Sequence, residues 1–167
     1  MTSRIRLIIL IAASAAVAAA QTKVGVLNSQ KAVLDTAEIK KAQAELEAKY
    51  KPRQDQMAKL QKELQDIQTQ LQGGKLNENA AQDLNLEGQR KQRELQRIQE
   101  DLQADVDRDR TEILQRTGGR MQDVVKKIAD EKGLDVVIDS ANTIYFKPAL
   151  DLTTEATAAY DKAYPVK

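Results

Sequence analysis

Apolar residues recur at alternating spacings of three and four along the first half of the chain, separated by charged residues and glutamines. The positions that carry this pattern are Ile39, Leu46, Tyr50, Met57, Leu60, Leu64, Ile67 and Leu71. Only Gln43 and Arg53 interrupt it. Because a 3.5-residue repeat keeps a narrow apolar stripe facing one partner helix, the pattern predicts a coiled coil.

This stripe ends at Gly73 and Gly74, and a helical pattern resumes after Asn77. The second stripe is weaker than the first. Its apolar positions are Leu84, Leu95, Ile98, Leu102, Val106, Ile113, Met121, Val124 and Ile128. Two helical stripes joined by a glycine turn predict an antiparallel helical hairpin arm over residues 36–132, with its tip near residues 72–78.

Short strand patterns flank the arm on both sides. Val24 and Val26 alternate with other residues after the N-terminal segment, which predicts a strand. Residues 134–139 and 143–147 have the same character and are separated by a tight turn, so they predict a β-hairpin. A final helix is expected up to Tyr160.

The flanking segments 21–35 and 133–167 are therefore expected to form a small β-containing body. The predicted fold class is α+β: one N-terminal strand and a C-terminal β-hairpin form the body, from which a long coiled-coil hairpin extends. A body of about 50 residues buries too little surface to be stable alone, and its strand edges invite pairing with another chain. The residues expected to form the shared interface are Val24, Val26, Val136, Ile138, Ile144 and Phe146.

Two local features interrupt the predicted arm. Pro52 lies inside the first helix, where it removes one backbone hydrogen bond, and Gly118 and Gly119 lie inside the second helix. They are either hinges or tolerated substitutions in long exposed helices. The sequence leaves both interpretations open.

The first twenty residues have the features of a targeting segment. Arg4 and Arg6 precede an apolar run, and Ala18–Ala20 offers a cleavage site before Gln21. A membrane anchor is the alternative, but the run is short and rich in alanine. No later stretch approaches the ~20 apolar residues that a membrane helix needs. Residues 1–20 are therefore expected to be a cleaved signal peptide, and the mature protein is expected to be exported.

Composition disfavours an enzyme. The chain has no Cys and no His, which removes the thiol nucleophile, a lipid-bearing cysteine, and the commonest metal ligand and general base. The 26 basic residues without Arg4 and Arg6 leave 24, against 25 acidic residues. This near-neutral balance does not favour a nucleic-acid partner and leaves open a weak contact with membranes or lipopolysaccharide.

The order of elements resembles the Skp/OmpH family of periplasmic chaperones. The resemblance lies in the opening strand and helix at residues 23–33, the hairpin arm, the segment 133–146 and the last helix at residues 151–160. It implies a homotrimer whose arms enclose a cavity for unfolded outer-membrane proteins. It also implies that the protein uses no ATP, cofactor or metal.

The surface of the predicted arm suits such a role. Thirteen of the fifty residues from Gln54 to Gln103 are glutamine, whose side chains are wettable and uncharged. Contact with clients is expected from apolar residues near the tip, namely Leu71, Leu76 and Leu84. The sequence therefore predicts an ATP-independent holdase for unfolded outer-membrane or secreted proteins. A structural coiled-coil adaptor of the cell envelope is the alternative.

The signal peptide gives a direct test. Protein recovered from the envelope fraction is expected to begin at or near Gln21, because the alanines before it match a signal-peptidase site. Mass spectrometry of the intact protein measures this terminus. A soluble cytoplasmic protein that retains Met1 would contradict the prediction.

Overall fold

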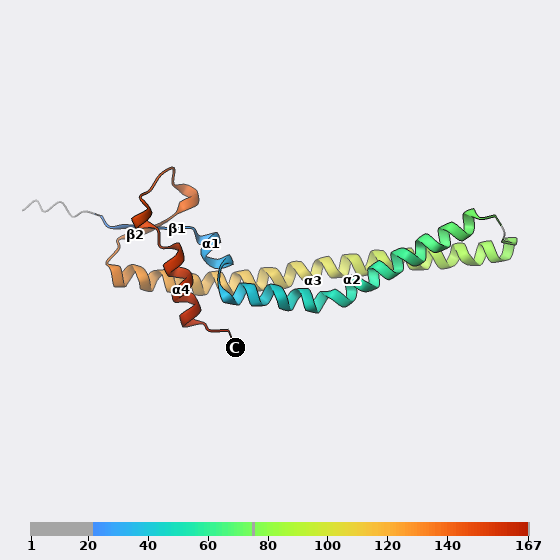
Figure 1. The fold of residues 1–167 in the computed structure, drawn as a ribbon, viewed down its shortest axis with the longest axis horizontal. Coiled ribbons are helices and arrows are strands. Elements are labelled where there is room, and N and C mark those ends of the chain that lie inside the picture. Colours follow the sequence, from blue (N-terminus) through green and yellow to red (C-terminus); the bar gives the residue numbers. More distant parts are fainter. Residues whose placement is uncertain (1–21, 75, 167) are drawn as a thin grey trace, which may run out of the picture.

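The computed structural model describes residues 22–74 and 76–166, and the predicted signal peptide lies outside them. Two long helices form an arm that extends from a small body (Figure 1). The elements in chain order are β1 (Val24–Leu27), α1 (Ser29–Leu34), α2 (Ala37–Gln72), α3 (Glu78–Lys132), β2 (Val136–Asp139), the 3-10 turns Ser140–Asn142 and Pro148–Leu150, and α4 (Thr153–Ala163).

Local capping interactions set the ends of the two arm helices. The side chain of Thr36 accepts a hydrogen bond from the Ile39 amide at the start of α2, and Asn77 accepts one from the Ala80 amide at the start of α3. These bonds satisfy amides that have no partner within the helix. Gly133 ends α3 in the left-handed conformation, with φ of 60°, which favours glycine. The two strands and the two long antiparallel helices confirm the predicted α+β class and the hairpin arm.

The predicted apolar stripes face each other along the arm. In α2 the buried members of the stripe are Ile39, Tyr50, Leu60 and Ile67. In α3, Leu95 is buried along the arm, whereas Met121, Val124 and Ile128 are buried where the helix runs on into the body. The remaining stripe residues are half-buried. This burial confirms the helical periodicity predicted for both halves of the arm.

Helix α3 also joins the arm to the body. It has 55 residues and α2 has 36, so α3 is longer by 19 residues, or about 28 Å at 1.5 Å per residue. Figure 1 shows this extra length running past the start of α2 into the body. There it contributes Met121, Val124 and Ile128 to a core completed by Leu27, Ala32, Leu152, Ala156 and Tyr160.

The sheet is two-stranded and parallel. Strand β1 pairs with β2 in a register that places Val24 opposite Val136 and Leu27 opposite Asp139. The predicted C-terminal β-hairpin is therefore wrong in its second strand, because residues 143–147 form a loop in the chain. The first strand of that hairpin is present as β2, but it pairs with the N-terminal strand.

Hydrogen bonds at the end of β2 explain the missing strand. The side chain of Asp139 accepts a bond from the Ala141 amide, and the backbone carbonyl of Asp139 accepts one from the Thr143 hydroxyl. The Thr143 amide donates to the Ser140 carbonyl at 3.1 Å. These bonds wind residues 140–142 into a 3-10 turn, so the chain does not fold back onto β2.

Helix α4 connects the early elements of the body. Its flanking residue Leu152 donates its amide to the Val26 carbonyl at 2.8 Å, and Thr153 accepts a bond from the Asn28 amide at 2.9 Å. The Thr157 hydroxyl donates to the Ala32 carbonyl at 3.1 Å. The C-terminal helix thus links β1 and α1 to the part of the core that α3 provides.

A substitution at Gly25 tests how tightly the body is packed. A Cβ at this position would lie 2.5 Å from Cδ1 of Leu152 and 2.9 Å from Cδ1 of Leu134. Gly25→Ala is therefore expected to lower the free energy of unfolding by about 1–3 kcal/mol. Chemical denaturation at a fixed protein concentration measures this difference.

Gly119→Ala is the matched control, because a Cβ there meets nothing within 4 Å. This variant is expected to raise the free energy of unfolding by about 0.5–1 kcal/mol through helix propensity. A Gly25→Ala variant as stable as the unmodified protein would contradict the packing described for the body.

Candidate functional site

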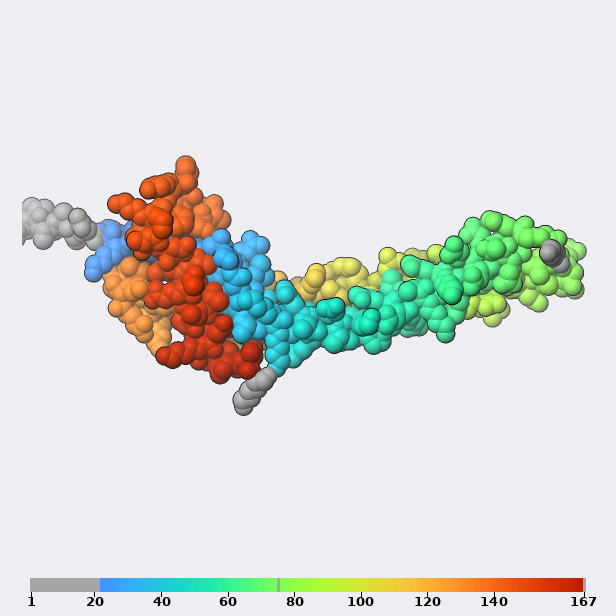
Figure 2. All heavy atoms as spheres, in the orientation of Figure 1, coloured from blue at the N-terminus to red at the C-terminus, as the bar shows by residue number. Residues whose placement is uncertain are grey.

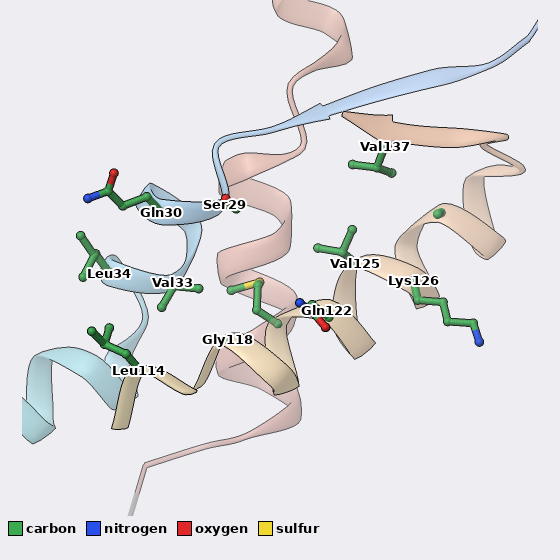
Figure 3. A pocket seen from close by; sticks show the side chains of 12 residues that line it. Ser29, Gln30, Val33, Leu34, Leu114, Gly118, Gln122, Val125, Lys126 and Val137 are labelled. Atoms are coloured by element: carbon green, nitrogen blue, oxygen red, sulfur yellow. The ribbon is translucent and has the colours of Figure 1, made fainter. Parts of the chain in front are cut away.

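An apolar groove of about 640 Å³ lies on the body between α1 and α3. Its apolar wall comes from Val33 and Leu34 of α1, Leu114, Met121 and Val125 of α3, and Val137 of β2. Figure 3 shows the side chains that line the groove, among them the polar residues Gln30, Gln122 and Lys126. The groove is open to solvent and mainly apolar, so it suits an apolar side chain or an extended chain segment.

A second groove of about 590 Å³ continues along the base of the arm. Its lining comes from both arm helices and includes Ile39, Leu46, Tyr50 and Val106. The two grooves share Leu34 and Leu114, whose exposed fractions are 39% and 45%. We call this continuous apolar surface the arm-base groove. Sequence reasoning missed this groove, because its lining residues lie far apart along the chain.

Polar bonds cross the arm along the seam between α2 and α3. The Tyr50 hydroxyl donates to Asp109 at 2.6 Å, and the ammonium of Lys49 donates to the same carboxylate. Arg53, which interrupts the apolar stripe, pairs with Asp105 at 2.6 Å. Nearer the tip, Glu63 pairs across the arm as well, with Lys91 at 2.7 Å.

The cross-arm partners keep the three carboxylates charged. The hydrogen bond from Lys49, followed by that from Tyr50, holds the pKa of Asp109 below its ordinary value. The hydrogen bond from Arg53 does the same for the pKa of Asp105, and that from Lys91 for the pKa of Glu63. These ion pairs therefore persist at neutral and mildly acidic pH.

Glu38 is the centre of a polar cluster where the arm meets the body. Its carboxylate accepts bonds from Arg116 at 3.0 Å, from Arg120 at 3.1 Å and from the hydroxyl of Tyr160. Burial alone raises the pKa of Glu38, since only 13% of its side chain is exposed. The bonds from Tyr160 and Arg116 and the charge of Arg120 outweigh burial and hold this pKa below its ordinary value.

The predicted contact residues at the tip do not form one exposed patch. Leu71 and Leu84 are half-buried in the arm, and Leu76 in the tip loop is 38% exposed. Leu71 lines a separate groove of about 550 Å³ that includes Gly88, whose added Cβ would lie 3.4 Å from Cγ2 of Ile67. The tip therefore offers less open apolar surface than the base.

The six predicted interface residues have very different exposures. Val26 is buried with 2% exposed, Val24 and Phe146 are half-buried, and Val136, Ile138 and Ile144 are exposed. The exposed fractions of Ile144 and its neighbour Tyr145 are 107% and 78%. Figure 2 shows residues 140–150 projecting from the body. Much of the predicted interface is thus open apolar surface in a single chain.

The predicted hinge residues lie within continuous helix. Helix α2 runs through Pro52, between the cross-arm bonds of Tyr50 and Arg53. Helix α3 runs through Gly118 and Gly119, and a Cβ added at either glycine meets nothing within 4 Å. Neither glycine is therefore required by close packing within the chain.

Among residues 22–74 and 76–166, no group of three or more His, Cys, Asp and Glu side chains is arranged to hold a metal ion. Over the same residues, none of the helices combines the length and the apolar character required to span a bilayer.

Comparison with known proteins identifies the family. Residues 23–160 match the family described as outer membrane protein (OmpH-like). Chaperone protein Skp of Yersinia enterocolitica is 30% identical over 151 residues, which cover 87% of this chain and 88% of that protein. A Skp-like protein of Pseudomonas aeruginosa is 26% identical over 141 residues, covering 81% and 82%.

A solved OmpH-like structure from Caulobacter crescentus has the same fold. It superimposes with a TM-score of 0.73 at 19% identity and covers 89% of each chain. A single polypeptide with a small body and a long helical hairpin is thus the shared architecture. The chain belongs to the OmpH-like outer membrane protein family, which includes the Skp chaperones. This membership supports an outer-membrane chaperone role and places the chain in a chaperone family rather than an enzyme family.

The cross-arm carboxylates make the stability of the arm depend on pH in the acid range. Because their pKa values are lowered by folding, their contribution to stability is complete above the ordinary pKa of about 4 and is lost as pH falls through the lower folded values. We therefore expect the thermal stability of the arm to fall below about pH 4. Asp105→Asn with Asp109→Asn is expected to lower stability at pH 7 and to make its fall in acid shallower.

Circular dichroism melts between pH 3 and pH 7 measure this dependence. Asp55→Asn is the control, because Asp55 pairs with Lys51 on the exposed face of α2, at 3.5 Å, and not across the arm. Identical acid profiles for the double variant and the unmodified protein would show that the cross-arm bonds do not stabilise the arm.

Proposed function

We propose that this protein is an ATP-independent periplasmic holdase that binds unfolded outer-membrane or secreted proteins in a cavity between the arms of a homotrimer. The observation that carries the proposal is the arm-base groove, a half-exposed apolar surface that begins on the body and continues onto the arm. Unfolded chains expose apolar segments, and such a groove shields them from water without enclosing them.

The composition of the groove suits weak and reversible binding. Its apolar lining is mostly aliphatic, and the polar residues that line it include the amides of Gln30, Gln43 and Gln122 and the charged side chains of Glu47, Arg110 and Lys126. Aliphatic contacts are not directional, so they accept many different sequences. A client segment bound in this way is held by several weak contacts, which dissociate without ATP. Leu76 at the tip is a further contact of the same kind, because it is exposed.

The exposed apolar residues of the body support the proposed trimer. Val136 and Ile138 are 41% and 38% exposed on β2, and the loop after it exposes Ile144 and Tyr145 almost completely. Such a surface on a small body favours association with other chains. Strand β2 also ends the two-stranded sheet, which makes it available for pairing. Three chains meeting there would direct three arms away from one body.

The groove gives a direct test of holdase activity. Leu34→Gln with Leu114→Gln keeps side-chain volume but removes two half-exposed apolar contacts, each worth about 1 kcal/mol to a bound client. The variant is expected to bind an unfolded β-barrel protein roughly thirtyfold more weakly, since about 2 kcal/mol is lost in total. Light scattering, recorded as the denatured client is diluted into buffer, measures its aggregation against chaperone concentration.

Leu86→Gln is the matched control, because Leu86 is similarly exposed at 44% but lies outside the groove. Equal protection by the groove variant and the control would remove the groove from the proposal. If the unmodified protein prevents no aggregation at any ratio, the coiled-coil adaptor becomes the better explanation of the fold.

Assembly is tested separately with Val136→Asp. In a single chain this side chain is 41% exposed, so the charge is tolerated there. In an assembly that buries β2, an unpaired charge destabilises the interface by about 3 kcal/mol or more. Light scattering coupled to gel filtration is expected to give the mass of three chains for the unmodified protein and of one folded chain for the variant.

Leu86→Asp on the arm has similar exposure and is expected to leave the mass at three chains. A Val136→Asp protein that also keeps the trimer mass would exclude β2 from the interface.

A further inference from the structure

Helix α3 has two adjacent glycines where the arm meets the body. Gly118 and Gly119 are adjacent in the helix, and a Cβ added at either meets nothing within 4 Å. Glycine lowers helix stability because it has the largest backbone freedom to lose. The backbone of this turn therefore has a lower helix propensity than that of its neighbours.

The glycine pair also lies at the level where the arm changes from two helices to one. Helix α2 begins at Ala37, and its first turn faces α3 through the bonds from Glu38 to Arg116 and Arg120. On the body side of this level, α3 continues without α2 and packs into the core through Met121 and Val124. Bending at Gly118 and Gly119 would therefore turn the whole arm against the body.

The carboxylate of Glu38 binds one arginine on each side of the glycine pair. Arg116 lies before the two glycines and Arg120 lies after them, and both guanidinium groups bind the carboxylate of Glu38. The distances are 3.0 Å from Nε of Arg116 and 3.1 Å from the nearest nitrogen of Arg120. Because the two arginines are joined through a single side chain of α2, their separation is fixed across the weak turn.

Helix α4 holds the same carboxylate from the body side. The hydroxyl of Tyr160, a fully buried residue, donates to Glu38, and Asp161 accepts a bond from the Ala37 amide at 2.9 Å. The guanidinium of Arg120 also lies 4.7 Å from the ring centre of Tyr164. The first turn of α2 is thus tied at once to α3 and to α4.

We infer that Gly118 and Gly119 form a hinge between arm and body, and that Glu38 locks this hinge by binding Arg116 and Arg120 on its two sides. While Glu38 binds both arginines, the arm keeps one orientation relative to the body. When the carboxylate loses either arginine, the helix bends at the glycines and the arm swings. This inference concerns the movement of one chain and does not depend on the proposed holdase activity.

Spin labels at two engineered cysteines measure the movement, because the natural chain has no Cys. Gln99→Cys places one label on the arm, and Asn142→Cys places the other on the projecting turn of the body, away from the axis of α3. Labelled chains are diluted with unlabelled chains, so that only distances within one chain are recorded. Circular dichroism of each variant establishes that its helices are retained.

Glu38→Gln is expected to broaden the distribution of distances, because the amide cannot hold both guanidinium groups by charge. Asp55→Asn is the control, since Asp55 pairs with Lys51 on the same helix, at 3.5 Å, and lies away from the hinge. Gly118→Ala with Gly119→Ala is expected to narrow the distribution and to cancel the broadening caused by Glu38→Gln.

Two results would overturn the inference. One is a folded Glu38→Gln protein whose distribution is as narrow as that of the control. The other is a broadening that persists after both glycines are replaced, which would place the movement elsewhere. If Glu38→Gln does not fold, Arg116→Gln is used instead. It leaves Glu38 paired with Arg120, so a smaller broadening is expected, and no broadening overturns the lock.

Discussion

The arm has only one buried face, and this constraint determines much of the remaining structure. Two helices packed as a hairpin bury a single stripe on each, so every residue of the seam has a large effect on stability. Where the stripe is polar, bonds across the arm replace apolar contact. Arg53 would interrupt the seam by itself, but it pairs with Asp105, and Tyr50 remains buried while its hydroxyl reaches Asp109.

The weak points of the two helices lie beside such bonds. Pro52 falls between the residues that bind Asp109 and Asp105, and the glycine pair of α3 falls between the two arginines that bind Glu38. Long two-helix arms cannot rely on a surrounding core for rigidity. Charge-assisted bonds across the seam provide this rigidity at particular positions along the arm. If the inferred lock at Glu38 operates, the arm is stiff along its length and turns only where one such bond can open.

The sequence was sufficient for the parts of the fold that depend on local pattern. Helical periodicity predicted the seam and the return of the chain as a second helix after Asn77, because this signal acts within a few residues. The strand at residues 143–147 was predicted wrongly, since its apolar alternation says nothing about which strand lies beside it. In a single chain the turn after Asp139 leads it away from β2.

The candidate site could be predicted only in part. The predicted contacts were placed at the tip, where Leu71 and Leu84 prove to be half-buried. The arm-base groove joins residues from α1, α2 and α3, and its lining depends on a packing angle that no local pattern encodes. The same applies to Glu38, whose partners lie 78 and 82 residues away along the chain. Sequence reasoning identified the glycine pair as unusual, but the structure was needed to find the carboxylate that spans it.

The arm is thus packed within one chain, whereas the body exposes apolar surface that the proposed trimer would cover. Hydrogen exchange of the assembled protein tests this division most directly. We expect the amides of residues 143–147 to be protected at high protein concentration and to exchange rapidly on dilution to single chains. The amides along the seam of the arm are expected to stay protected in both states. Rapid exchange at 143–147 in the assembled protein, or loss of arm protection on dilution, would contradict this division.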